Sequence, residues 1–147
     1  MIENIMRDDK LLAIIISNRF DKPGIHFFTD NDLSQQVAYM RHPIGKKIDP
    51  HVHNLVKREV HYTQEVLLVK RGKLRVDFYD ENQNYFKSRV LEGGDVILLA
   101  TGGHGFEVIE EVEMIEVKQG PYAGDFDKTR FVGVGLGEIC MMDGKNE

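Results

Sequence analysis

Two histidines and a glutamate lie close together in the segment 45–72. His51 and His53 are separated by one residue, so on a strand their side chains point to the same face. Glu65 opens an apolar run, 66–69, that has the length and β-branched content of a strand buried on both faces. A carboxylate that enters such a strand loses solvation and needs a partner. Two imidazoles and a carboxylate that converge inside a β structure most simply indicate a metal ion.

Two further histidines are candidates for the same site. His104 lies in the glycine-rich segment TGGHG and is a possible fourth ligand. The place of His61 depends on how the chain runs from His53 to Glu65. If residues 54–64 only lengthen a hairpin, His53 lies about 5 Å from Glu65, and His61 lies about 13 Å along the strand, at the pocket mouth. If the segment instead loops out, His61 could replace His53 as a ligand.

Composition describes an ordinary globular chain of one domain. The 147 residues are 41% apolar, with 14 glycines besides. The net charge of −5 argues against a nucleic-acid or anionic-membrane partner but leaves room for a small ligand. Cys140 is the only cysteine, so no intrachain disulfide can form. No apolar run has the ~20 residues of a membrane span, and the run 11–16 follows acidic residues and makes a poor signal peptide. We therefore expect a cytoplasmic protein.

Short strand-like segments recur roughly every ten residues, with turn signals between them and no long helical period. This pattern predicts an all-β sandwich or barrel. The run 66–69 does not alternate and is expected to be central, whereas 73–79 alternates and is expected to form a hairpin with 85–91. The predicted strands are 11–17, 25–29, 37–42, 47–53, 62–70, 73–79, 85–91, 95–100, 105–109 and 112–118.

The spacing of these residues resembles the two sequence motifs of the cupin family. The first motif is usually written G(x)5HxH(x)3–4E(x)6G, and the residues that match it are Gly45, His51, His53, Glu65 and Gly72. The second is written G(x)5PxG(x)2H(x)3N, and the residues that resemble it are Gly94, Gly102 and His104. Three departures stand out. Eleven residues separate His53 from Glu65. The spacing to His104 is one residue short, with Ala100 where the family has proline, and no asparagine follows His104.

The resemblance covers about residues 37–118. It implies a single cupin domain over residues 1–147, built as a jelly-roll barrel with an irregular extension at 120–147. Carried over by position, it implies one metal ion per chain. The ligands would be His51, His53, Glu65 and His104. Nitrogen and oxygen ligands of this kind suit a divalent Mn, Fe, Co, Ni or Zn ion.

A site of three histidines and one carboxylate leaves positions open at which a small molecule can bind. The resemblance extends to small cupins of bacterial surface-polysaccharide and nucleotide-sugar chemistry, so isomerisation or epimerisation of a sugar is the first hypothesis. His61 and Tyr62 are the candidate general bases, and His61, Lys118 and Tyr122 are expected in the ligand pocket. The alternatives are a metal-containing binding or sensing module without turnover and a metal-dependent dioxygenase.

Two segments are candidates for contact with a second copy of the chain. The apolar strand at 11–16 is long for an exposed sheet edge and carries no charge that would hinder edge-to-edge pairing. We therefore predict a homodimer in which this strand, or residues 130–136, lies against the partner. The polar segment 54–64 is predicted to be a hairpin with its turn near Glu59, forming one wall of the ligand pocket.

Overall fold

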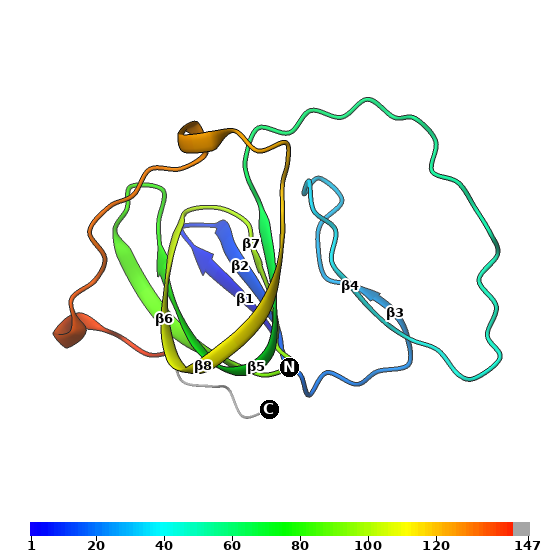
Figure 1. The fold of residues 1–147 in the computed structure, drawn as a ribbon, viewed down its shortest axis with the longest axis horizontal. Coiled ribbons are helices and arrows are strands. Elements are labelled where there is room, and N and C mark those ends of the chain that lie inside the picture. The colour runs from blue at the N-terminus through cyan, green and yellow to red at the C-terminus, as the bar shows by residue number, and fades with distance from the viewer. Residues whose placement is uncertain (143–147) are drawn as a thin grey trace.

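The computed structural model describes residues 1–142 as strands joined by loops and two short 3-10 turns. One six-stranded antiparallel sheet curls strongly into a half-barrel (Figure 1). Its strands are β1 (Ile2–Arg7), β2 (Lys10–Ile16), β5 (Glu65–Tyr79), β6 (Tyr85–Glu92), β7 (Val96–Leu99) and β8 (Gly103–Lys118). A separate two-stranded sheet consists of β3 (Gly24–Phe27) and β4 (Ala38–Arg41), which lies beside the half-barrel. The all-β prediction is confirmed.

The long strand β5 organises the sheet. Its first half lies between β7 and β8, and its second half lies between β6 and β8. The prediction that 66–69 is central is therefore confirmed, as is the hairpin between 73–79 and 85–91. The predicted strands 62–70 and 73–79 are parts of this one strand, whose pairing with β8 shifts register around Gly72. Gly72 has φ +87°, and a Cβ there would lie 2.0 Å from a backbone oxygen of β8, so the position requires glycine.

The core fills the concave side of the half-barrel. Alternate residues of β5 point inward, and Leu67, Leu74, Val76 and Phe78 are each at most 1% exposed. Burying a side chain of this size stabilises the fold by about 1.5–3 kcal/mol. On the other face of β2 and β7, a second apolar cluster packs against Phe20 and the β3–β4 sheet. β2 and β7 therefore bury apolar residues on both of their faces.

The strand β2 is not an edge of the sheet, which corrects the premise of the predicted dimer contact. It pairs with β1 on one side and with β7 on the other. Part of the other predicted contact, 130–136, packs on its own chain. The Phe131 ring lies 5.0 Å from the Tyr79 ring, and the Val134 amide donates to the Tyr79 hydroxyl at 2.9 Å. The homodimer itself stays a prediction, but these contacts are not the free surfaces that it assumed.

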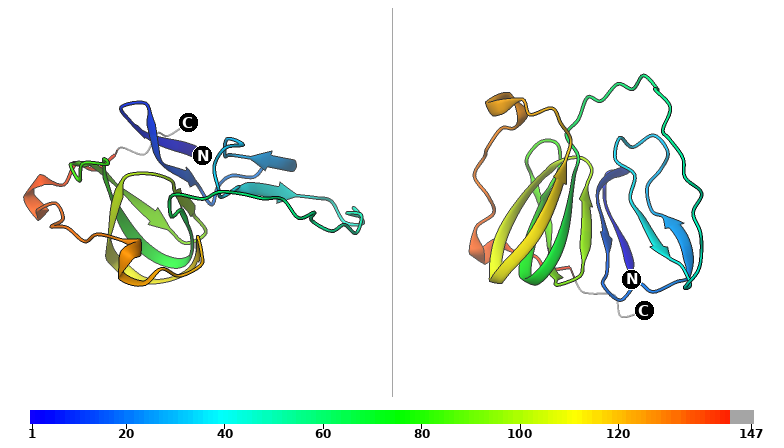
Figure 2. Two further views of the ribbon diagram at one scale, coloured as in Figure 1. Left: turned by 90° about the horizontal axis from the view of Figure 1, so that it is seen from above. Right: turned by 45° about the vertical axis from the view of Figure 1, so that its right-hand side comes forward.

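Residues 42–64, which we call the arm, depart most from the sequence prediction. Neither the strand at 47–53 nor the hairpin centred on Glu59 is present, and the arm loops out from the half-barrel (Figures 1 and 2). The residues around Glu59 include no Gly, Asn, Asp or Pro to form a tight turn, which explains why no hairpin closes there. Ile44 and Leu55 on the arm are fully exposed.

The segment after β8 wraps along the opposite side of the half-barrel (Figure 2). It contains the 3-10 turns η1 (Gly124–Asp127) and η2 (Leu136–Glu138) and returns to β6, where Met141 bridges to Ser88. The last part of the predicted irregular extension, 143–147, lies outside the described residues. Within residues 1–142 no helix is long and apolar enough to cross a membrane.

A candidate acid–base site at the mouth of the half-barrel

Glu65 and His104 meet at one end of the half-barrel. The strand β5 folds over near Gly72, so that its first and last residues lie at the same end of the molecule (Figure 1). Glu65 begins β5, and His104 follows the β7–β8 turn and pairs with Phe78 near the other end of β5. The curl of the sheet therefore brings His104 Nε2 to 3.1 Å from Glu65 Oε2. Glu65 is 8% exposed, which makes it a buried carboxylate with a specific partner.

A second set of contacts joins this pair to the segment after β8. Lys118 Nζ lies 3.7 Å from Glu65 Oε1 and 3.2 Å from Asp127 Oδ2. The hydroxyl of Thr63 donates to the other oxygen of Asp127 at 2.7 Å. These polar contacts thus hold four segments together, namely the end of the arm, the start of β5, the end of β8 and η1.

The surroundings of Glu65 favour its ionised form. A hydrogen bond from His104 lowers the pKa of Glu65, burial opposes this effect, and the nearby charges of Lys118 and Lys128 add to the lowering. The hydrogen bonds from Thr63 and Lys118 lower the pKa of Asp127 in the same way. The hydrogen bond to Asp127 raises the pKa of Lys118. At neutral pH the site therefore holds two carboxylates and an ammonium group.

The pair opens into a cavity of about 900 Å³. Its wall is formed by the end of the arm, the β5–β6 and β7–β8 turns and the segment 123–131. Aromatic side chains supply much of the apolar lining, namely Tyr62, Tyr79, Phe106, Phe126 and Phe131. The charged and imidazole groups that line it are of both signs, namely His61, Glu65, Asp80, Glu81, His104, Asp127, Lys128 and Arg130. An apolar wall with a few convergent polar groups is the usual composition of a small-molecule site.

The residues predicted for the ligand pocket fall partly in this cavity. His61 and Tyr62 line it. Lys118 contacts Glu65 Oε1 but is not one of the residues that line the cavity. Tyr122 is 84% exposed and lies outside the wall. Asp127 and Arg130 line the cavity but were not predicted, because their segment shows no hydrophobic period that would place it.

The four predicted metal ligands are divided between two places. Glu65 and His104 are together, while His51 and His53 lie on the exposed arm with their rings 5.3 Å apart. Within residues 1–142 no three His, Cys, Asp or Glu side chains are placed to hold a metal ion. Two ligands of one ion, each about 2.1 Å from it, are about 3.0–3.4 Å apart. The Glu65–His104 pair fits that spacing, but the set of four does not converge while the arm lies as it does.

No family model matches the chain, and comparisons with curated proteins and with solved structures find no match. The resemblance to cupins therefore depends on the two sequence motifs alone.

Proposed function

We propose that this chain binds a small polar molecule in the cavity at the mouth of the half-barrel, with Glu65 and His104 at the reactive centre. The observation that carries the proposal is the contact of 3.1 Å between a buried carboxylate and an imidazole that lines the cavity. A carboxylate hydrogen-bonded to an imidazole fixes the orientation of the ring. Such a pair is suited to moving a proton to and from a bound molecule.

The reaction that suits this pair is isomerisation or epimerisation next to a carbonyl group. His104 takes a proton from the carbon beside the carbonyl, and the electron pair left behind moves onto the carbonyl oxygen as an enolate. In an isomerisation His104 returns the proton to the neighbouring carbon, and in an epimerisation a second acid delivers a proton to the opposite face of the same carbon. Glu65 offsets the positive charge that the ring carries in between. His61 and Tyr62 also line the cavity and are candidates for a second proton transfer.

The lining suits a hydroxylated ligand with an acidic group at one end, because Glu65, Asp80, Glu81 and Asp127 can accept hydrogen bonds from hydroxyls while two basic residues also line the cavity. Lys128 and Arg130 can pair with a phosphate or carboxylate, and aromatic rings offer flat apolar surfaces beside them. Together with the cupin resemblance, this composition supports a sugar or nucleotide sugar of surface-polysaccharide biosynthesis. If the bound molecule is not converted, the same cavity serves a binding or sensing module.

The predicted metal remains a second proposal for the same pair. Its support is the spacing of Glu65 and His104, which equals that of two neighbouring ligands of one ion. His51 and His53 would complete the set, giving one divalent Mn, Fe, Co, Ni or Zn ion in a jelly-roll site. A bound ion would supply Lewis acidity toward a carbonyl or hydroxyl oxygen, and iron would favour the dioxygenase alternative.

The test is proton exchange measured by NMR in deuterated water, on nucleotide sugars, small diols and oxo-acids. We expect the wild type to exchange one carbon-bound proton of a ligand, with a rate at least ~100-fold lower in His104→Gln. Glu65→Gln should lower the rate as well, because the ring loses its charged partner. Tyr122→Phe is the matched control, since this side chain is exposed and outside the cavity wall. Equal exchange rates in His104→Gln and wild type would show that His104 has no role in the mechanism. The metal proposal has its own test, which is elemental analysis of untreated protein.

A further inference from the structure

One edge of the strand β8 has no partner in the described part of the chain. The strand is 16 residues long and pairs with β5 alone. The backbone N–H and C=O groups along its other edge can therefore pair with another extended segment. Natural sheets shorten, charge or cover such edges, and β8 is charged but is neither short nor covered.

An apolar strip lies beside this open edge. Phe106, Val108 and Met114 of β8 stand opposite Val76, Leu74 and Val69 of β5 in the pairing register. Directly opposed residues share a face, so the three β8 residues lie on the core side of the sheet. Their exposed fractions are nevertheless 41%, 56% and 39%, whereas their partners are fully buried. The inward face of the half-barrel is thus left uncovered along β8.

The arm has the complementary properties. The backbone of residues 47–60 forms no hydrogen bond to another backbone group within the described chain. Their apolar side chains include Val52, 86% exposed, and Leu55, fully exposed. The sequence predicts a strand at 47–53, and a strand forms only where a neighbouring strand supplies its hydrogen bonds. The backbone of the arm therefore lacks the hydrogen-bond partners that the open edge of β8 can supply.

The charges of the two segments also match. The arm carries Lys46, Lys47, Lys57 and Arg58 against Asp49 and Glu59. The strand β8 carries five glutamates and one lysine. Four of these glutamates already pair with basic residues of β5, and Glu116 has no ion pair within residues 1–142. A positively charged segment is favoured next to such a strand.

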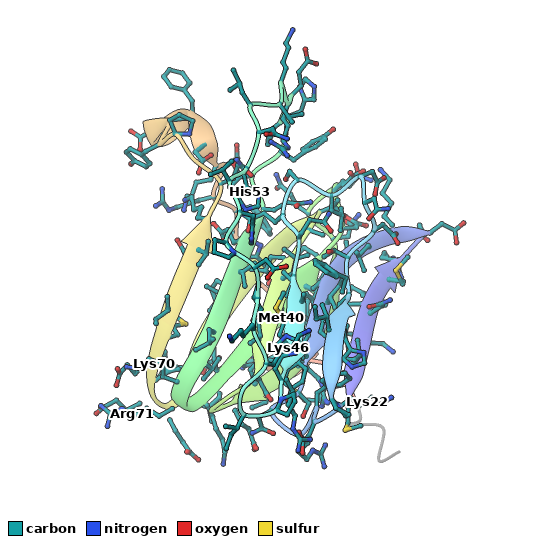
Figure 3. The ribbon with its side chains drawn as sticks, turned by 90° about the vertical axis from the view of Figure 1, so that its right-hand side faces the viewer. Lys22, Met40, Lys46, His53, Lys70 and Arg71 are labelled. Carbon is teal, nitrogen blue, oxygen red and sulfur yellow. The ribbon has the colours of Figure 1, made fainter. Side chains whose placement is uncertain are left out.

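We propose that the arm of each chain pairs with the open edge of β8 in a second copy, so that two copies exchange arms in a symmetric dimer. Both ends of the arm are fixed, by the pairing of β4 with β3 and by the start of β5, and between them it projects away from its own half-barrel (Figures 1 and 2). Figure 3 shows Lys46 and His53 on the arm, in front of the strands. In a two-fold symmetric dimer each arm pairs with the β8 edge of the other copy, so both open edges and both arms gain a partner. This proposal does not depend on the chemistry of Glu65 and His104.

The oligomeric state gives the first test. Light scattering at micromolar concentration should give the mass of two chains for the wild type. Replacing residues 44–60 by a short Gly-Ser linker should give the mass of one chain while circular dichroism retains the β spectrum. Val108→Lys should weaken the dimer by placing a charge in the apolar strip, and Tyr122→Lys is the control, since Tyr122 is 84% exposed and lies outside the arm, β8 and 130–136. A monomeric wild type, or a linker variant that stays dimeric, overturns the proposal.

Crosslinking then identifies whose arm occupies the edge. In a Cys140→Ser background, chains with Val52→Cys are mixed with chains carrying Phe106→Cys, Val108→Cys or Met114→Cys, and a short bismaleimide is added. We expect a covalent dimer of two different chains for at least one of these mixtures. A single chain that carries both Val52→Cys and Val108→Cys is the comparison. If this chain crosslinks internally and no mixture gives a covalent dimer, the arm folds onto its own β8 and the exchange is refuted. Neither readout depends on a ligand or metal, so failure here is distinct from failure of the proposed function.

Discussion

Gly102→Ala tests whether the β7–β8 turn, which places His104, is as constrained as the structure indicates. Gly102 has φ +71°, and a Cβ there would lie 2.4 Å from the Tyr79 carbonyl oxygen and 2.9 Å from a Leu12 methyl carbon. The left-handed backbone alone costs an alanine roughly 1–2 kcal/mol. Relief of the overlap requires movement of backbone, which adds about 1–3 kcal/mol. We therefore expect a loss of about 2–5 kcal/mol, a large part of the 5–15 kcal/mol typical of a domain.

Urea unfolding followed by circular dichroism measures this loss as a lower midpoint at unchanged slope. Gly105→Ala is the matched control, because its Cβ would find its nearest neighbour at 3.8 Å and its backbone is not left-handed. The control should stay within about 0.5 kcal/mol of the wild type. A Gly102→Ala variant as stable as the control would show that the turn relaxes freely, and the argument that it fixes His104 would fail.

Two further substitutions test the polar contacts of β5 and of the turn that follows it. Asp77→Ala removes a buried carboxylate that accepts two hydrogen bonds from Arg75, at 2.8 and 3.1 Å, and should lower the free energy of unfolding in urea by about 3 kcal/mol. Glu81→Ala is the control, because Glu81 is in an exposed ion pair and its loss should cost at most about 1 kcal/mol. Equal losses of stability in the two variants would contradict the role of burial. Hydrogen bonds from Asn84 lower the pKa of Asp80, so its stabilising contribution is present above the unfolded pKa and is lost as pH falls through the folded one. Thermal melts in acid should therefore decline less steeply for Asp80→Asn than for wild type, and parallel curves would refute this.

The strands that bury apolar residues on one or both faces could be predicted from the sequence. Continuous apolar runs form β2, the first half of β5 and β7, and the second half of β5 alternates. The local sequence pattern therefore predicts which of their residues are buried. β1 could not be predicted this way. Its sequence, IENIMR, contains two charged residues, and only Ile5 is buried. It is a strand because β2 offers it a partner, which is a property of the fold and not of the segment.

The site shows the same division between local and long-range information. Glu65 and His104 were singled out by residue type and motif spacing, and the structure brings them together because β5 folds over near Gly72. The contacts of Asp127 with Lys118 and Thr63 depend on the path of an irregular segment after β8. No periodic pattern specifies such a path, so the contacts of Asp127 cannot be predicted from the sequence.

The arm links the two proposals, because it carries His51 and His53 while the half-barrel carries Glu65 and His104. A metal bound by all four residues is impossible while the arm projects outward, so such a metal would require an arm to dock at the mouth of a half-barrel. Acid–base chemistry by Glu65 and His104 has no such requirement, since that pair is already formed. A metal lost equally on substitution of His51 and of His104 would therefore show that the docked arm belongs to the functional state. A metal-free protein that is active with a shortened arm would instead restrict the role of the arm to assembly.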